Sequence, residues 1–155
     1  MHKIDKLDIE IINLLIDNGR ISCADIAHKL GYATERTVRY RVERLVKDGL
    51  IKIKAITNPI AVGYTVIADV FIEVEPGMIS EVANKLVKFD CVSYVACSTG
   101  DRDVSIQIVA RNNAEAYSFV TEVIGKVPGV RKTMTSIVPV ILKDIYDWHI
   151  PKSAE

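Results

Sequence analysis

Apolar residues near the N-terminus recur every three or four positions, which is the spacing of one helix face. The run from Leu7 to Leu15 predicts a first helix, which Asp5 caps and Asn18-Gly19 ends. Ser22 is placed to cap a shorter second helix, and its hydroxyl would accept a hydrogen bond from a free amide of the first turn. Gly31 then ends the second helix in a tight turn.

A third helix is predicted from Thr34 to Asp48, with Gly49 as its stop. At about 100° per residue, Val38, Val42 and Leu45 share one face of this helix. The opposite face gathers basic and aromatic side chains. A helix, a short helix, a glycine turn and a helix with a basic face follow one another in a helix-turn-helix.

The next segment, Leu50 to Ala55, alternates isoleucine with lysine. This period of two predicts a short strand, or wing, whose lysines lie beside a phosphate backbone. Asn58-Pro59 and Gly63 follow, and such residues interrupt regular structure. We therefore expect a helix-turn-helix DNA-binding domain over residues 1–54 and a linker strand over residues 55–64.

From residue 65 to residue 155 the apolar pattern takes on the period of strands, interrupted by two helical stretches. The order βαββαβ is that of the ferredoxin-like fold, an antiparallel sheet with both helices on one face. The chain is thus predicted to be an α+β protein, and the other face of its sheet needs a cover, such as a partner's sheet. The predicted strands are Val66–Val74, Val92–Ser98, Asp103–Ala110 and Val130–Ile141, and the predicted helices run from Pro76-Gly77 to Phe89 and from Asn112-Asn113 to Pro128-Gly129.

The formal net charge of zero conceals an asymmetry along the chain. Residues 1–55 carry eleven Lys and Arg against eight Asp and Glu, whereas the remainder carries nine against twelve. Seven of the basic residues lie between Arg36 and Lys54, which indicates a polyanion partner, here double-stranded DNA. The alternative is a solvated helix face with local ion pairs. The candidate DNA contacts are Ser22, Thr34, Arg36, Thr37, Arg39, Tyr40, Arg44, Lys47 and Lys52.

Several other classes of protein are disfavoured by the sequence. The apolar run Ile60–Val66 is far too short to span a bilayer, and residues 1–10 lack the apolar core of a signal peptide, so a cytoplasmic location is expected. Cys23, Cys91 and Cys97 have neither disulfide nor zinc spacing. Because no nucleophile–base pair, phosphate-binding loop or metal-ligand spacing occurs, we predict no catalytic residue, metal or cofactor.

A Gly-Asp pair within Thr99–Arg102 suits a hairpin turn between the second and third predicted strands. One interpretation is a turn and nothing more. The other is a ligand site, in which backbone amides bind a carboxylate and Asp101 or Asp103 pairs with an ammonium group. Two threonines on one face of the last strand are either plain strand residues or further hydroxyl ligands. The candidate effector contacts are Gly100, Asp101, Arg102, Asp103, Thr133 and Thr135.

Short motifs are spread over nearly the whole chain. They are Ile4-Asp5-Lys6-Leu7-Asp8 with Ile11-Ile12-Asn13-Leu14-Leu15, Gly19-Arg20-Ile21-Ser22, Val38 with Arg41-Val42-Glu43-Arg44-Leu45 and Gly49-Leu50-Ile51, Asn58-Pro59 with Val62-Gly63-Tyr64, Gly100-Asp101-Arg102-Asp103, and Val127-Pro128-Gly129-Val130 with Thr133 and Thr135. In this order and at these spacings they resemble the Lrp/AsnC, or feast/famine, transcription regulators. The family often has aromatic residues where this chain has Arg102 and Val104.

The resemblance implies a sequence-specific DNA-binding regulator, not an enzyme, that responds to a small effector, commonly an amino acid. It implies a homodimer whose C-terminal sheets pack together, with further assembly to tetramers or octamers. Residues 65–155 would then sense the effector, near the Gly-Asp-x-Asp loop, and hold the oligomer. Two alternatives remain: the same architecture serves sirohaem decarboxylase subunits of haem biosynthesis, and an assembly protein would bind no ligand.

Overall fold

The computed structural model describes residues 4–151, so the expected domain limits at residues 1 and 155 lie outside the described residues. The chain divides into two compact units. Residues 57–141 form one, which we call the sheet unit, and the segments on either side of it form the other, the helical unit. The segment from Leu142 onward therefore does not belong with the sheet, in contrast to the single domain expected over residues 65–155.

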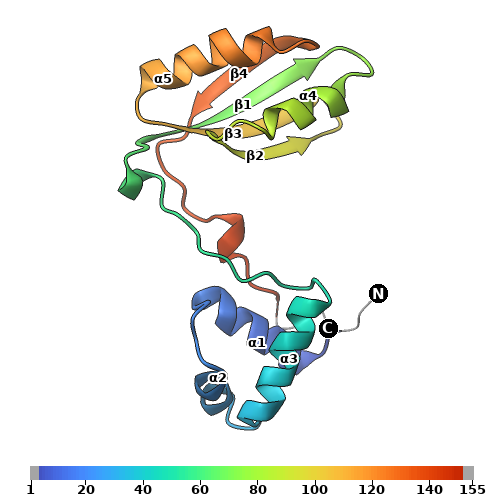
Figure 1. Cartoon of the computed structure of the whole chain (residues 1–155), viewed down its shortest axis with the longest axis vertical. Coiled ribbons are helices and arrows are strands. Elements are labelled where there is room, and N and C mark those ends of the chain that lie inside the picture. The colour runs from blue at the N-terminus through green and yellow to red at the C-terminus, as the bar shows by residue number, and fades with distance from the viewer. Residues whose placement is uncertain (1–3, 152–155) are drawn as a thin grey trace. The chain divides into compact units, whose positions relative to one another are not determined.

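Three helices make up most of the helical unit, and each begins at the predicted cap. Asp5, Ser22 and Thr34 each accept a hydrogen bond from the backbone amide three residues ahead, which satisfies a donor that the first turn leaves free. Gly31 ends the second helix at φ 73°, a left-handed conformation that glycine adopts without strain. The helices are α1 (Lys6–Asp17), α2 (Cys23–Leu30) and α3 (Glu35–Lys47), labelled in Figure 1.

A small apolar core joins these helices. Ile150, from the C-terminal segment, packs against the same core, and this contact explains why the segment belongs to the helical unit. The predicted inward positions Val38 and Leu45 are both fully buried. The buried members of the core are Ile11, Ile12, Ile26, Val38 and Leu45.

A buried carboxylate lies beside this core. Asp8 on α1 has no exposed surface, and its two carboxylate oxygens accept hydrogen bonds from Arg41 at 3.0 Å and from Arg44 at 2.5 Å, both on α3. One of these oxygens also accepts the Asp5 amide at 3.1 Å, completing a reciprocal cap of α1. A buried charge is tolerated only when it is paired and hydrogen-bonded, so this cluster fixes α3 against α1.

The strand, or wing, expected over Leu50–Ala55 is not formed, because the structure assigns no strand to that segment. Ile51 packs against the core, whereas Ile53 is largely exposed. Alternation alone does not make a strand, since the N–H and C=O groups also need a neighbouring strand to pair with. The linker strand expected over residues 55–64 is likewise absent, and a short 3-10 helix, Ile60–Val62, lies there instead.

The sheet unit has the predicted βαββαβ order, with an antiparallel sheet in the strand order β2-β3-β1-β4. The last strand ends at Ile137, four residues before the predicted end at Ile141. The Val138 amide still bonds the Ile67 carbonyl, but Pro139 has no N–H with which to continue the ladder. The elements are β1 (Val66–Val74), α4 (Ile79–Leu86), β2 (Val92–Cys97), β3 (Val104–Ala110), α5 (Asn113–Ser118), which continues into a π-helical turn (Phe119–Val123) and a 3-10 turn (Ile124–Lys126), and β4 (Val130–Ile137).

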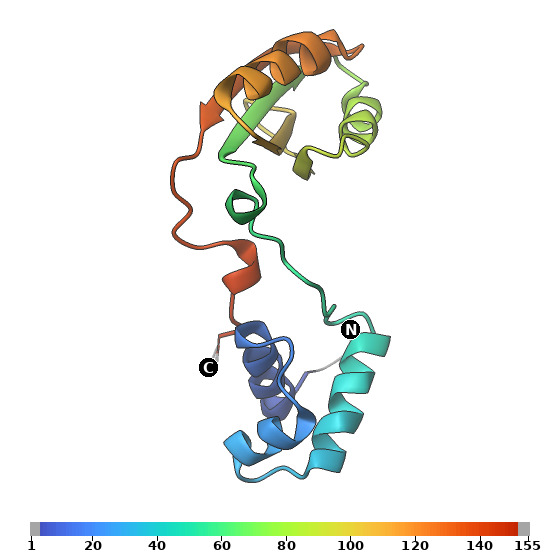
Figure 2. The same cartoon turned by 60° about the vertical axis from the view of Figure 1, so that its left-hand side comes forward.

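Alternate residues give the sheet two different faces. On β1, the set from Val66 to Val74 in steps of two is buried, and it shares a core with α4, α5 and the turns that follow α5. Figure 2 shows the ribbons of these helices beside the sheet. The intervening residues, among them Ile67 and Phe71, are only half-buried. Side chains along a strand alternate between the faces, so these residues lie on the face away from the core. We call it the open face.

Replacing Asp8 with Asn is expected to destabilise the helical unit, because Arg44 loses its charged partner and Arg41 keeps only Asp5. Removing one partner of a buried ion pair destabilises a protein by about 3–5 kcal/mol. We expect the lower end of this range, because the side chains of Arg41 and Arg44 are 23% and 32% exposed, so water can solvate them when Asp8 is neutral. The measurement is urea unfolding followed by circular dichroism, with hydrogen exchange in α1 and α3.

The matched control for this prediction is Glu43→Gln, which neutralises an exposed carboxylate on α3. It should change the free energy of unfolding by less than about 0.5 kcal/mol. Equal stability of the two variants would mean that the Asp8 cluster does not hold α3 in place.

Candidate DNA-binding and effector sites

The outward face of α3 carries exposed basic and aromatic side chains. Arg36, Arg39 and Tyr40 are all exposed, and Tyr40 is 65% exposed. Arg39 forms an exposed ion pair with Glu35 one turn earlier, and this hydrogen bond raises the pKa of the Arg39 guanidinium. Exposed pairs of this kind contribute little, so a phosphate or base edge competes with Glu35 readily. None of the ion pairs found among residues 4–151 includes Arg36.

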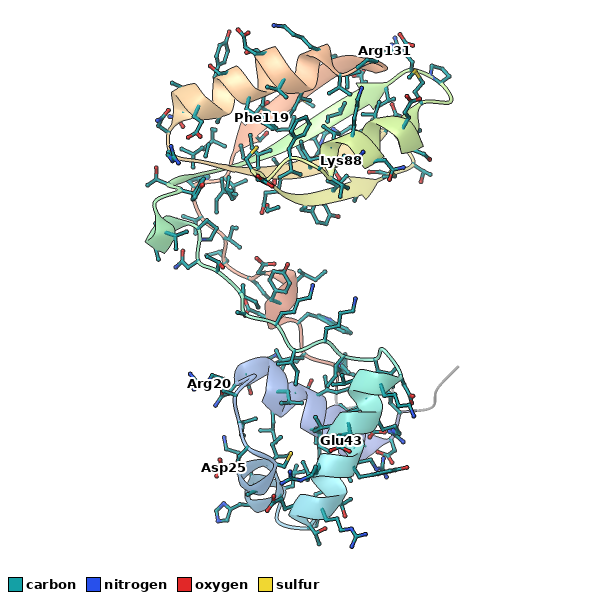
Figure 3. All side chains as sticks on the ribbon, in the orientation of Figure 1. Arg20, Asp25, Glu43, Lys88, Phe119 and Arg131 are labelled. Atoms are coloured by element: carbon teal, nitrogen blue, oxygen red, sulfur yellow. The ribbon has the colours of Figure 1, made fainter. Side chains whose placement is uncertain are left out.

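The predicted hydroxyl contacts lie at the beginnings of α2 and α3. Ser22 Oγ accepts the Asp25 amide at 3.0 Å and lies 2.6 Å from an oxygen of the Asp25 carboxylate (labelled in Figure 3). Thr34 Oγ1 accepts the Thr37 amide at 3.2 Å and lies 2.9 Å from the Thr37 hydroxyl. These hydroxyls therefore serve first as helix caps, although they remain exposed where helix amides favour an anion.

Arg44 differs from the other basic candidates on α3. Its guanidinium pairs with buried Asp8, and its Nε is buried without a hydrogen-bond partner among the described residues. Arg41, which was not among the predicted DNA contacts, pairs with Asp5 at 2.6 Å as well as with Asp8. The hydrogen bond from the Asp8 amide, followed by the one from Arg41, holds the pKa of the Asp5 carboxyl below its usual value. These two arginines thus face α1.

The sequence contained a signal for this arrangement. Asp8 lies three and four residues before Ile11 and Ile12, so it belongs to the apolar stripe of α1. A carboxylate within an apolar stripe indicates a buried partner of opposite charge. By contrast, Lys47 at the end of α3 and Lys52 beyond it are exposed, as a contact with phosphate requires.

The loop between β2 and β3 borders a cavity of about 350 Å³. Phe71 and Ser105 lie directly opposite each other in the β1–β3 ladder, and both point to the open face. The cavity therefore lies on the side of the sheet that the helices leave uncovered. Its lining residues are Phe71, Ser98, Thr99, Asp101, Arg102 and Ser105.

Two opposite charges line this cavity. The Arg102 guanidinium lies 3.9 Å from the centre of the Phe71 ring, a cation–π contact that positions the cation. No ion pair found within residues 4–151 involves Arg102, so its charge is open to an anionic group. Asp101 supplies a carboxylate to the same cavity.

Asp103, in contrast, is hydrogen-bonded to the protein backbone. Its carboxylate accepts the Val74 amide at 2.7 Å, beside the point where the β1–β4 register shifts. Its backbone N–H donates to the Ile72 carbonyl at 3.1 Å, and its carbonyl accepts the Ser98 amide at 2.9 Å. These bonds anchor the loop to the end of β1, so Asp103 positions the loop while Asp101 lines the cavity.

Thr133 and Thr135 lie on the other side of the sheet. The β1–β4 register places Thr133 opposite Ile72 and Thr135 opposite Val70, and both of these β1 residues are buried under the helices. Residues opposite each other in an antiparallel ladder share a face. One chain therefore does not bring the two threonines together with Asp101 and Arg102.

Residues 4–151 offer neither a metal site built from His, Cys, Asp or Glu side chains nor a membrane-spanning helix. No group of three or more His, Cys, Asp or Glu side chains in that range is placed to hold a metal ion. None of the helices in that range combines the length and apolar character needed to cross a bilayer. The three cysteines are free thiols, and burial raises the pKa of Cys91.

Comparison with known proteins gives both units a family. Residues 4–52 match winged helix-turn-helix DNA-binding domains, and residues 67–146 match the Lrp/AsnC ligand binding domain. The HTH-type transcriptional regulator FL11 of Pyrococcus abyssi is 39% identical over 136 residues, covering 87% of this chain and 89% of that protein. An uncharacterised HTH-type transcriptional regulator of Pyrococcus furiosus is 36% identical over 141 residues, or 90% and 95% of the two chains.

Solved structures agree with this match. E. coli AsnC superposes with a TM-score of 0.83 at 25% identity, covering 94% of this chain and 99% of that one. A transcriptional regulator of Neisseria meningitidis, solved as a complex with L-methionine, has the same fold, with a TM-score of 0.86 at 21% identity over 96% and 97% of the chains.

The relatives are transcriptional regulators, which confirms the expectation of a regulator over an enzyme and leaves the haem-biosynthesis alternative without support. The α+β class, with a helix-turn-helix followed by a ferredoxin-like unit, is confirmed as well. By the match of its helical unit to a winged helix-turn-helix and of most of its sheet unit to a ligand-binding domain, this chain belongs to the Lrp/AsnC family of transcription regulators.

Proposed function

We propose that this regulator binds its operator as a homodimer in the cytoplasm and that an α-amino acid bound at the Asp101–Arg102 cavity alters that binding. The observation that carries the proposal is the pairing of opposite charges in one cavity: Asp101 beside an Arg102 held on Phe71. An α-amino acid carries an ammonium and a carboxylate, which complement these two groups. The match to a ligand-binding domain supports a small-molecule effector.

The cavity favours acidic and polar amino acids over basic ones. The Arg102 cation repels a side-chain ammonium and attracts a side-chain carboxylate. The hydroxyls of Ser98, Thr99 and Ser105 add polar partners around it. L-Methionine, which accompanies the Neisseria meningitidis relative, is a useful apolar competitor in a screen.

Replacing Arg102 with Gln or Asp101 with Asn should weaken effector binding, because each change removes one charge-assisted hydrogen bond. We expect a loss of about 1.5–3 kcal/mol, or roughly ten- to a hundredfold in affinity. Calorimetry with the amino acids measures it. Asp90→Asn, an exposed carboxylate outside the cavity, is the matched control. Unchanged affinity in both cavity variants would move the effector site elsewhere.

For DNA, we propose that Arg36, Arg39 and Tyr40 reach base edges in the major groove, while Lys47 and Lys52 contact phosphates. Long exposed side chains on one helix face are what groove recognition requires. Ser22, Thr34 and Thr37 would approach phosphates from the beginnings of the helices. Arg44 contributes to DNA binding indirectly, because its ion pair with Asp8 positions α3 against α1.

Replacing Arg36 with Ala should weaken operator binding by about 1–3 kcal/mol if the side chain contacts a base edge. Lys88→Ala, which removes an exposed cation from the sheet unit (labelled in Figure 3), should leave binding unchanged. Arg44→Ala should lower the stability of the helical unit as well as DNA affinity. Electrophoretic mobility shift with the chain's own promoter measures binding, and normal affinity of a folded Arg36→Ala variant rejects the assignment.

The open face supports the homodimer. The helices cover only one face of the sheet, and the open face carries Ile67, Phe71 and Met134, the last of which is 46% exposed. A sheet face with apolar side chains is stabilised when a second sheet packs on it. We propose that a second copy covers this face, and that dimers assemble further to tetramers or octamers.

Sedimentation of the wild-type chain at micromolar concentration should show a dimer or a multiple of it. Met134→Asp places a charge on the open face and should shift the population toward the 17.2 kDa monomer. Tyr117→Asp, an equally drastic change at a 70% exposed position on α5, is the control and should leave the assembly intact. A monomeric wild-type chain contradicts the proposal.

A further inference from the structure

The C-terminal segment docks on the helical unit through one asparagine. The side-chain amide nitrogen of Asn13 on α1 donates to the Ile150 carbonyl at 2.9 Å. The side-chain oxygen of Asn13 accepts the Ile150 amide, also at 2.9 Å. A single side chain thus satisfies both peptide groups of one residue, as a neighbouring β-strand would. Such a clamp holds an extended segment without depending on which side chain the segment carries.

Two further contacts give the docking its sequence preference. The Ile150 side chain packs against the apolar core of the helical unit. The His149 Nε2 atom lies 2.8 Å from a carboxylate oxygen of Asp17, one turn along α1 from Asn13. A groove between α1 and α2, with a cavity of about 520 Å³, borders the docked segment, and Leu14 and Leu30 form part of its wall.

The rest of the C-terminal segment makes few contacts of its own. Leu142 and Ile145 are 95% and 77% exposed, and a short 3-10 turn, Ile145–Asp147, capped by Asp144, is its one regular element among the described residues. The contacts of His149 and Ile150 with α1 and the helical core, together with the 3-10 turn beside α1, therefore hold the segment on the helices. The groove also leaves the outward face of α3 free, since neither Arg36 nor Tyr40 lines it.

We propose that the face of α1 that carries Asn13 and Asp17 is a peptide-docking surface for the chain's own His149-Ile150 segment, which forms part of the groove wall. We propose further that the docked segment is a second attachment between the DNA-binding and effector-binding units. The chain leaves the helical unit before Thr57 and returns to it after Ile141, so docking closes a loop that contains the whole sheet unit. Two attachments restrict how each DNA-binding unit of a dimer is presented, which raises the effective concentration of the second unit at its half-site. The inference rests on the proposed dimer, and the docking segment lies beyond both family matches, which end at residues 52 and 146.

The test compares the full-length chain with Asn13→Ala and with a chain ending at Asp147. The matched control is Asn84→Ala, which removes an exposed asparagine from α4. Hydrogen exchange measured by mass spectrometry follows the peptide containing Ile150, where the loss of two hydrogen bonds in Asn13→Ala should speed exchange by about tenfold or more. Affinity for promoter DNA with two half-sites should fall by roughly three- to tenfold in Asn13→Ala and in the truncated chain, with sedimentation and circular dichroism unchanged.

The possible outcomes are separable. Equal protection of Ile150 in Asn13→Ala and wild type overturns the docking. Faster exchange with promoter affinity equal to that of Asn84→Ala overturns the second attachment. If wild-type protein sediments as a monomer, the proposed dimer fails, while the exchange measurement still decides whether the segment docks.

Discussion

The ion pairs of buried Asp8 with Arg41 and Arg44 are the constraint on which the DNA-binding face depends. Three helices with a small core have little apolar area to fix their angles, so a buried charge cluster decides which side of α3 faces α1. With Arg41 and Arg44 turned toward α1, Arg36, Arg39 and Tyr40 are left on the outside. The helix proposed to read DNA is thus oriented by two of its own arginines.

In the sheet unit, too, one charged residue holds the fold while its neighbour remains available to a ligand. Asp103 bonds the backbone at the end of β1 and fixes the β2–β3 loop, and the neighbouring Arg102 is then held over Phe71 at the open face. Because the proposed dimer contact uses the open face as well, the proposed effector cavity lies beside the surface where a second copy would pack. An effector there would be well placed to change how two copies meet.

Features that depend on a few neighbouring residues were predicted from the sequence. Helix starts at Asp5, Ser22 and Thr34 follow from side chains that cap free amides, and the end of α2 follows from a glycine. The order of strands and helices along the chain was predicted from the hydrophobic period. The predictions of strands over Leu50–Ala55 and over residues 55–64 were wrong. A strand also needs a neighbouring strand to pair with, and no local pattern supplies one.

The sequence by itself determined the element order, the family motifs and the inventory of charged groups. Only the tertiary structure decided which charges remain available to ligands, since pairing joins residues far apart in the chain. Arg44 pairs with Asp8, and the Asp103 carboxylate accepts the amide of Val74. Asn13 hydrogen-bonds to Ile150, 137 positions away. These pairings follow from burial, because a polar group removed from water costs free energy unless it is hydrogen-bonded. Which partner lies within hydrogen-bond distance depends on the tertiary structure.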